Sequence, residues 1–339
     1  MTTDAHDKAF WETKNESFLT ATPDCDLLHP QFTEVNRAPT LTETQYFGFS
    51  VPEANIHAAA YLWHHPNLGV VTGGVFAFQG IKSHALQSEL FNWTNFMDDE
   101  VLANDLWDYR FENGYHVQTL EPLKRHRLRY VDEARQNAFD LETEALMEPA
   151  LLQTGMHFEQ AMRVRGGLTL RGKTYQVDCT SVRDRSWGQA RSEQHMPTPP
   201  MDWMTGVFTA TFAFGCTAYD HPDLNPDWKG QLEVPGGDPA KGGWVYRDGT
   251  LIPIVGARKK VQHDHATLQP TTAEMVLTDA AGRDYAIRGE VVAANRHALW
   301  PNVNAWLCLI RWEWDGQVCY GDLQQVQWHD YVRQFLRSP

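Results

Sequence analysis

The sequence predicts an all-β protein made of antiparallel β-barrels or sandwiches with few short helices. From Tyr46 onward, short apolar and aromatic segments such as YFGFSV, IHAAAYLWHH and GVVTGGVFAF are separated by turn residues, as in β-strands. In the second half, Gly or Asp-Gly lies between two alternating runs in LTLRGKTYQVD, WVYRDGTLIPI and LIRWEWDGQVCYG, which is typical of tight hairpins. Many short strands with few helices favour barrels or sandwiches over a parallel α/β sheet.

The length of 339 residues indicates two domains, because it exceeds what one hydrophobic core usually organises. Residues 1–40, in which TPDCDLLHP follows a weak helical pattern, are expected to form an N-terminal arm. Strand patterns then predict a first β domain over residues 41–150. The segment MEPALLQTG contains Pro and Gly between two strand-rich blocks, so we place the boundary there and expect a second β domain over residues 151–339. The final DLQQVQWHDYVRQFL predicts a closing helix.

Composition limits the partners and the compartment. A net charge of −14 without a Lys/Arg stripe argues against nucleic acid as a partner. No apolar run approaches the roughly 18 residues of a membrane helix, and the polar N-terminus lacks the features of a secretory signal. We therefore expect a cytoplasmic protein without a membrane span. Five cysteines without a CxxC pair predict reduced, buried thiols instead of disulfides or structural zinc.

Several familiar catalytic motifs are absent from the sequence. It has no GxGxxG, GxxxxGKS/T, GxSxG or HExxH, which argues against nucleotide-dependent chemistry and serine hydrolysis, and we predict no cofactor. His263 and His265 lie two apart in QHDH, but such pairs are expected by chance among 15 histidines, so we predict no metal site. The acidic run MDDEVLAND is interpreted as a solvated loop or a helix N-terminus.

The segment VRDRSWG places three charges directly before Ser-Trp-Gly. It continues the alternating run YQVDCTS, so a strand would point Arg183 and Arg185 to one side and Asp184 to the other. In a structural interpretation, the arginines clamp carboxylates elsewhere in the fold and Asp184 accepts hydrogen bonds from a loop. In a functional interpretation, Asp184 projects into an aromatic-lined cavity, where desolvation keeps it protonated for acid catalysis and Trp187 stabilises a developing cation.

Three segments together resemble a known superfamily. HFEQ at residues 157–160, the hairpin GGLTLRGKTYQVD and RDRSWG at residues 183–188 resemble the carotenoid 1,2-hydratase and AttH-like superfamily, in particular its poorly characterised bacterial branch. The resemblance implies two lipocalin-like domains packed together, with a hydrophobic pocket near their junction. Characterised relatives hydrate an alkene of a carotenoid or of a prenylated flavonoid, and fungal relatives of similar fold assist cyclisations. The Asp-x-x-Trp-Gly segment of the hydratases carries over to Asp184, Trp187 and Gly188.

The mechanism implied by the resemblance needs an acid, an aromatic surface and a second polar group that holds water. Asp184 would protonate an alkene carbon, and the second group would activate the water that adds to the cation. Glu159 in HFEQ is the preferred second group. Tyr219 and His221 in CTAYDHPD are further candidates, since they share one face if the chain is extended, although Pro222 equally suits a plain strand end.

Trp107 and Tyr109 in LWDYRF are expected either to line the same cavity or to be plain core residues. The preferred hypothesis is a cofactor-independent hydratase or dehydratase that acts on a hydrophobic terpenoid, steroid or prenylated aromatic molecule. Two alternatives stay open, namely an isomerase or cyclase of a hydrophobic polyene and a non-catalytic binder of a lipid-like ligand. The sequence also leaves self-association into a homo-oligomer open.

Overall fold

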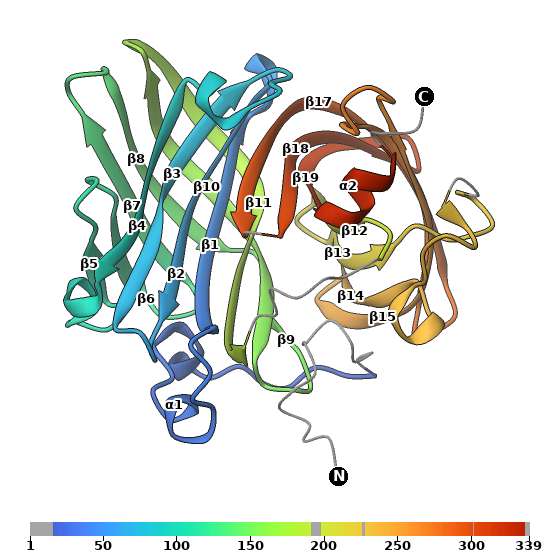
Figure 1. Cartoon of the computed structure of the whole chain (residues 1–339), viewed down its shortest axis with the longest axis horizontal. Helices are drawn as coiled ribbons and strands as arrows, with labels where there is room; N and C mark the ends of the chain where they lie inside the picture. The colour runs from blue at the N-terminus through green and yellow to red at the C-terminus, as the bar shows by residue number, and fades with distance from the viewer. Residues whose placement is uncertain (1–15, 191–197, 226–227, 301, 336–339) are drawn as a thin grey trace. The chain divides into compact units, whose positions relative to one another are not determined.

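The computed structural model describes residues 16–190, 198–225, 228–300 and 302–335. It divides the chain into two compact units (Figure 1). The first unit contains Leu19–Gln79 and the chain from Ser88 to the end of the eleventh strand. The second unit contains Gly80–Gln87 and the chain from the twelfth strand on. Strands make up most of both units, which confirms the predicted all-β class.

The first unit is a curled sheet of eleven strands, coloured from blue to green in Figure 1. Ten strands follow the order β4-β3-β2-β1-β11-β10-β8-β7-β6-β5, β9 pairs with β10, and every pairing is antiparallel. The alternating sequence pattern buries one face of each strand in a shared apolar core that includes Phe47, Leu128 and Val177. The strands are β1 (Leu41–Val51), β2 (Ile56–His65), β3 (Val70–Gln79), β4 (Leu90–Asp98), β5 (Asp108–Arg110), β6 (His116–Glu121), β7 (Arg125–Asp132), β8 (Asn137–Ala145), β9 (Ala150–Leu151), β10 (His157–Leu170) and β11 (Lys173–Ala190).

Short helical turns connect parts of the first unit. They are η3 (Pro23–Asp26), α1 (Phe32–Val35), η4 (Pro52–Ala54) and η6 (Asp99–Leu102). The acidic run MDDEVLAND begins η6, and the Asp98 carboxylate accepts a hydrogen bond of 3.0 Å from the Glu100 backbone N–H. This cap satisfies a backbone donor at the start of the turn, so the predicted helix N-terminus is confirmed.

The second unit contains a closed barrel of eight antiparallel strands in sequence order, coloured from yellow to red in Figure 1. Its interior is filled by apolar side chains that include Phe214, Ile287 and Trp312. The strands are β12 (Met201–Thr209), β13 (Phe212–Tyr219), β14 (Ala240–Arg247), β15 (Thr250–His263), β16 (Pro270–Asp279), β17 (Asp284–Trp300), β18 (Val303–Trp314) and β19 (Gln317–Trp328). The helical elements are η5 (Ala85–Gln87), η8 (Pro235–Gly237) and α2 (His329–Phe335).

The closing helix is shorter than the sequence pattern suggested. The helix α2 begins at His329, whereas the preceding DLQQVQ segment belongs to β19. This segment pairs with β12 on one side and β18 on the other, and it thereby closes the barrel. The alternation of buried Leu323 with Gln324 is that of a strand, and the non-local pairing decides its conformation.

The division between the two units differs from the boundary expected near residue 150. The motif strand β11 is the neighbour of β1 and β10, so it belongs to the first sheet and not to the second unit. The Pro- and Gly-containing segment MEPALLQTG forms β9 and its flanking turns, within the same unit. Residues 19–40 of the expected N-terminal arm also belong to the first unit, where the Leu19 N–H donates to the Leu151 carbonyl at 2.9 Å.

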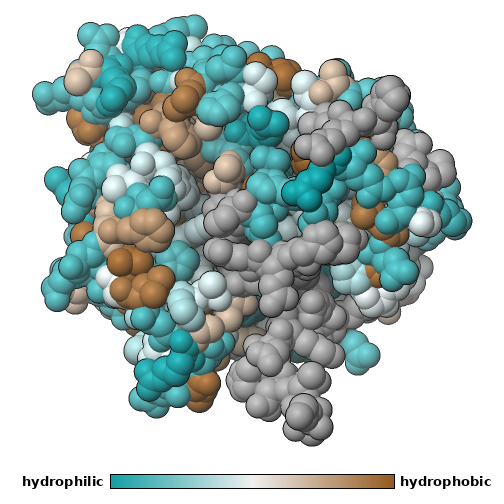
Figure 2. Space-filling view, in the orientation of Figure 1, coloured by the Kyte–Doolittle hydropathy of each residue, from teal (hydrophilic) through white to brown (hydrophobic). Residues whose placement is uncertain are grey.

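Hydrophilic side chains cover most of the face seen in Figure 2, and hydrophobic ones form small groups between them. All five cysteines are buried free thiols, which confirms the prediction of reduced cysteines. Within the described ranges, no helix is both long and apolar enough to span a membrane.

Candidate functional site

The RDRSWG strand has two chemically different faces. Arg183 and Arg185 are 1% and 0% exposed and lie on the interior side of the curled sheet. Their partners across the neighbouring strands are Gln160 and Phe47 for Arg183, and Phe158 for Arg185. Asp184 is half-buried and, as the alternation predicts, lies on the opposite side of the sheet from the arginines.

Arg183 forms a buried ion pair with a carboxylate far away in the sequence. Its guanidinium donates to both oxygens of Asp26, at 2.6 and 3.2 Å, and to Gln160 Oε1 at 2.9 Å. His126 Nε2 lies 3.3 Å from the same carboxylate, which also accepts the Leu123 backbone N–H. Burial alone would raise the pKa of Asp26, but Arg183 and His126 hold it well below its usual range. Asp26 is therefore a fully ionised, buried partner of the motif.

Arg185 binds the segment that follows Asp26. It donates to the backbone carbonyls of Asp26 and Leu27 at 2.8 and 3.0 Å, and its guanidinium lies 3.3 Å from Glu43 Oε2. The Glu43 carboxylate in turn accepts the His29 backbone N–H at 2.9 Å. The two arginines thus clamp the N-terminal segment onto the sheet, which agrees with the structural interpretation of these side chains.

The Trp187 side chain is packed against other side chains of the protein and is not part of an open surface. Its ring stacks on His29 at a centroid distance of 4.1 Å and an interplanar angle of 3°, and Phe158 meets it edge-on at 6.2 Å. The indole is 2% exposed within a small apolar cluster with Cys25 and Met156. The expected contact with a substrate is therefore corrected to a contact with the N-terminal segment.

The opposite face of β11 brings two predicted residues together. Glu159 on β10 is the direct cross-strand partner of Asp184, and Tyr46 on β1 is its partner on the other side. Directly opposed side chains of an antiparallel pair have Cβ atoms about 5 Å apart. His157 Nε2 also approaches Glu159 Oε1 at 3.8 Å. Tyr61 on β2 is in turn the cross-strand partner of Tyr46. We call these four residues the carboxylate–tyrosine row, namely Glu159, Asp184, Tyr46 and Tyr61.

Aromatic rings extend this row across the sheet. Tyr46 and Tyr61 meet edge-on at a centroid distance of 5.5 Å. Tyr61 in turn lies 5.4 Å from Trp63 and 6.4 Å from Trp93. The sequence analysis missed these aromatic residues as site candidates. Their alternation in YFGFSV and AAYLWHH predicted strands, but the pairing of β1 with β11 that brings them to Asp184 spans more than 130 residues.

The other predicted site residues lie elsewhere. Tyr109 is buried on the interior side, where its hydroxyl donates to Gln45 Oε1 at 2.8 Å and burial raises its pKa. Because Gln45 is the cross-strand partner of Arg185, Tyr109 lies on the side of the arginines and not on that of Asp184. Trp107 precedes β5 and is 45% exposed, so it lines no enclosed cavity with Tyr109.

Tyr219 and His221 belong to the second unit. Tyr219 is buried at the end of β13, with the Lys241 ammonium 5.5 Å from its ring centroid. His221 follows the strand end and is half-buried, with Nδ1 3.4 Å from Arg258 Nη1. The strand ends at Tyr219, in agreement with the alternative of a plain strand end before Pro222, so the two residues do not lie on one extended strand face.

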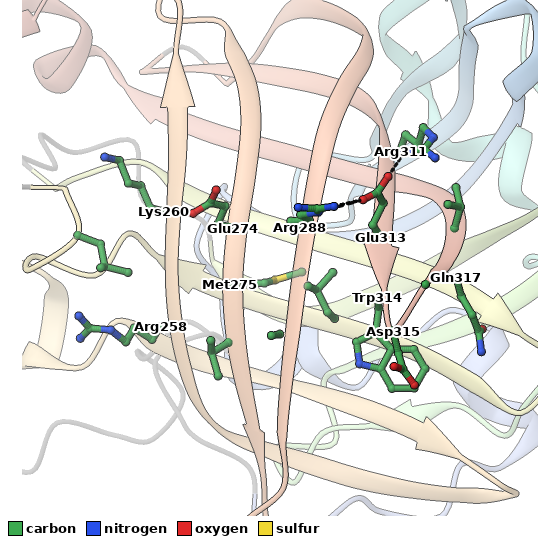
Figure 3. A pocket seen from close by; sticks show the side chains of 16 residues that line it. Arg258, Lys260, Glu274, Met275, Arg288, Arg311, Glu313, Trp314, Asp315 and Gln317 are labelled. Atoms are coloured by element: carbon green, nitrogen blue, oxygen red, sulfur yellow. Dashed lines mark hydrogen bonds and ion pairs between the residues drawn. The ribbon is translucent and has the colours of Figure 1, made fainter.

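The second unit carries an open groove on the outer side of β15 to β18. Its volume is about 810 Å³, and none of the predicted site residues lines it. Figure 3 shows Glu313 between Arg288 and Arg311, and the Arg288 Nη2 lies 2.7 Å from the Glu313 carboxylate. Hydrogen bonds from both arginines lower the pKa of Glu313. The two guanidinium groups and the single carboxylate together carry one net positive charge.

Solved structures that resemble the chain share its fold at low sequence identity. Kievitone hydratase from Nectria haematococca is 10% identical, with a TM-score of 0.52 over 96% of this chain and 100% of that chain. An AttH-like protein from Nitrosomonas europaea is 10% identical, with a TM-score of 0.54 over 93% of this chain and 98% of that chain. CghA is 9% identical, with a TM-score of 0.50 over 86% of this chain and 88% of that chain. At this identity, the likenesses show that the chain shares its fold with these three proteins.

Sequence comparison places the chain in a family without an assigned activity. No curated protein matches the sequence. Residues 26–331, which include every strand from β1 to β19, match the family described as a domain of unknown function, DUF7064. The chain therefore belongs to the DUF7064 family.

Proposed function

We propose that the chain is a cofactor-independent hydro-lyase, a hydratase or dehydratase, in which Asp184 and Glu159 act as an acid and base pair. The observation that carries the proposal is their direct cross-strand pairing beside Tyr46. The proposed substrate is a hydrophobic terpenoid, steroid or prenylated aromatic molecule with an alkene or a tertiary alcohol. The hydratase-like fold supports the reaction class.

The proposed reaction needs only proton transfers and water. In the hydration direction, the Asp184 carboxyl donates a proton to one alkene carbon, and a cation forms at the other carbon. Glu159 accepts a proton from water as the water oxygen bonds to this cation. The Asp184 O–H bond, the alkene π bond and one water O–H bond break, while one C–H, one C–O and one Glu159 O–H bond form. Return of the proton from Glu159 to Asp184 restores the enzyme, so the reaction adds one water overall. The reverse sequence dehydrates a tertiary alcohol.

The neighbouring rings suit the cationic intermediate. The faces of Tyr and Trp rings attract a positive charge by about 0.5–2 kcal/mol, and more where water is excluded. Tyr46 is 4% exposed and lies next to Asp184 in the carboxylate–tyrosine row. Arg183 and Arg185 point to the other side of the sheet, so neither guanidinium shares the face on which the cation would form.

The proposal is tested by incubating the purified protein with prenylated phenols, terpenoid alkenes and tertiary terpenoid alcohols in ¹⁸O-labelled water. Mass spectrometry should show a product that differs from its substrate by one water, with the label incorporated on hydration. Asp184→Asn should abolish turnover. Asp178→Asn, an exposed aspartate at an even position of the same strand, is the matched control and should retain it.

Other results would assign one of the alternatives. A product of unchanged mass would indicate an isomerase or cyclase. A co-purified ligand that stays unchanged and unlabelled would indicate a binding protein. Full turnover in Asp184→Asn would reject the proposed acid.

A further inference from the structure

The second unit contains a small cavity between the end of β15, the loop that follows it and the helix α2. Its volume is about 290 Å³, near the lower end of the range for small-molecule sites. Its lining combines polar side chains with an apolar wall. The lining residues are Asn225, Lys260, Val261, Gln262, His263, His265, Leu268, Tyr331 and Phe335.

A buried charge network lies beneath this cavity. Lys259 and both its partners, Asp202 and Asp220, are 0% exposed. The Lys259 ammonium donates to Asp202 and, at 2.6 Å, to Asp220 Oδ1. Asn225 Nδ2 donates to the other oxygen of Asp220 at 2.6 Å, which links the network to the cavity wall. When both carboxylates are ionised, the three groups carry one net negative charge.

A chain of amide hydrogen bonds connects this network to His263. Gln327 Nε2 donates to the Leu268 carbonyl at 2.8 Å and to Gln325 Oε1 at 2.6 Å. Because a backbone carbonyl only accepts, this contact sets the orientation of the Gln327 amide. Gln325 must then present its oxygen to Gln327, and its Nε2 donates to Asp202 Oδ1 at 3.0 Å.

The same reasoning sets the tautomer of His263. Its Nε2 lies 2.7 Å from Gln325 Oε1, which is an acceptor in this network, so Nε2 carries a hydrogen. Burial lowers the pKa of His263, although Asp220 and Asp202 act in the opposite direction. The neutral ring therefore offers the lone pair of Nδ1, so His263 can supply a hydrogen-bond acceptor to the cavity that it lines.

The apolar wall is aromatic. Tyr331 and Phe335 of α2 lie 4.6 Å apart between ring centroids, and Tyr331 packs in one cluster with Trp228 and Leu268. Aromatic rings of this arrangement favour a planar apolar ligand that packs against them. Lys260 also borders the cavity, but it is the cross-strand partner of Glu274 and lies on the face of β15 opposite to His263.

We propose that this cavity binds a phenol. The aromatic ring would pack against Tyr331 and Phe335, and the hydroxyl of the neutral phenol would donate to His263 Nδ1. A carboxylate fits less well, because the Nδ1 lone pair and the net negative network beneath it would both repel its oxygens. The same repulsion favours the neutral phenol over its phenolate.

The inference is independent of the proposed lyase reaction, since it uses other residues in the other unit. The test uses the full chain and 4-nitrophenol, at a pH below that at which the free phenol ionises. Calorimetric titration should show saturable binding of the neutral phenol. 4-Nitroanisole lacks the hydroxyl and should bind at least about tenfold more weakly in calorimetric competition.

Two variants locate the site. Phe335→Ala removes part of the aromatic wall and should weaken binding by at least about tenfold, and Lys229→Met, at an exposed lysine of the same unit, should behave as the wild type. His263→Gln should weaken binding by at least about tenfold. The proposal is overturned if the wild type shows no saturable binding, if 4-nitroanisole binds equally well, or if Phe335→Ala binds as the wild type. If His263→Gln fails to fold, Phe335→Ala decides.

Discussion

Glu159 and Asp184 face each other across β10 and β11, with Tyr46 as the next member of the same row on β1. One residue earlier along the motif strand, Arg183 faces Gln160 on the other side of the sheet. The strand β11 therefore supplies Arg183 to the ion-paired interior and Asp184 to the opposite face, where β10 adds Glu159. This separation follows from the period of two along a strand, and it keeps the arginines from pairing with the proposed catalytic acid.

If Glu159 activates water, Glu159→Gln should lower the turnover of the proposed hydratase by about 10²-fold or more, because an amide cannot take a proton from water. The Michaelis constant should change much less, since the row of aromatic rings is retained. Steady-state kinetics would separate the two effects. Glu144→Gln, an exposed glutamate on β8, is the control and should leave both constants unchanged. A variant at residue 159 with normal turnover would remove Glu159 from the mechanism.

Arg183→Met should destabilise the first unit by about 3–5 kcal/mol, because it leaves the Asp26 carboxylate buried without its guanidinium partner. In the double variant Asp26→Leu/Arg183→Met, the substitution of Asp26 removes that unpaired charge. The double variant should therefore recover part of the lost unfolding free energy. Urea unfolding measures both. The exposed pair of Arg163 with Asp178 is the comparison, and Arg163→Met should cost less than about 1 kcal/mol. Equal losses of unfolding free energy in Arg183→Met and Arg163→Met would contradict a strong buried ion pair between Arg183 and Asp26.

The strands and the two faces of β11 could be predicted from the sequence, because alternation and turn residues act over a few neighbouring positions. The hairpin at Gly172 and the opposite directions of Arg183 and Asp184 are examples. The partners of these residues could not be predicted. Asp26 lies 157 positions before Arg183, and Tyr46 reaches Asp184 only because the first long strand pairs with the eleventh. Because of the same non-local pairing, β11 belongs to the first unit, and the boundary between the units follows β11 instead of lying near residue 150.

The stability of the first unit should fall as the pH drops from neutral, partly because of His57. This side chain is 0% exposed, and burial lowers its pKa to about 3. In the unfolded chain a histidine has a pKa of about 6.5. Between these two values the unfolded state binds a proton that the folded state does not, so stability is lost as the pH falls through this window.

The contribution of His57 can be isolated by comparing variants at two pH values. Between pH 7 and pH 5, the unfolding free energy of the wild type should fall by about 2 kcal/mol more than that of His57→Leu. Other buried histidines are common to both proteins and cancel in this difference. His84→Leu, at an exposed histidine, should show the wild-type slope. Parallel slopes for the wild type and His57→Leu would mean that His57 gains its proton in the folded state as readily as in the unfolded chain.

Gly188, the last residue of the motif, should be intolerant of a side chain. It has a φ of +71°, and a Cβ there would come within 2.6 Å of the Phe32 ring in α1. Gly188→Ala therefore combines backbone strain with a clash against the segment that the motif arginines hold, and it should cost about 2–4 kcal/mol.

The matched control for this prediction is Gly249→Ala. Gly249 has a φ of +85°, but a Cβ there would meet nothing within 4 Å, so only the backbone strain of about 1–2 kcal/mol is expected. Urea unfolding of both variants gives the difference that belongs to the contact with Phe32. In Phe32→Ala/Gly188→Ala, the smaller side chain should remove this difference, which a double-mutant cycle measures as a coupling energy. A cost at Gly188 no larger than that at Gly249 would show that Phe32 moves aside freely, and that the clamp of Arg183 and Arg185 does not hold α1 against the motif.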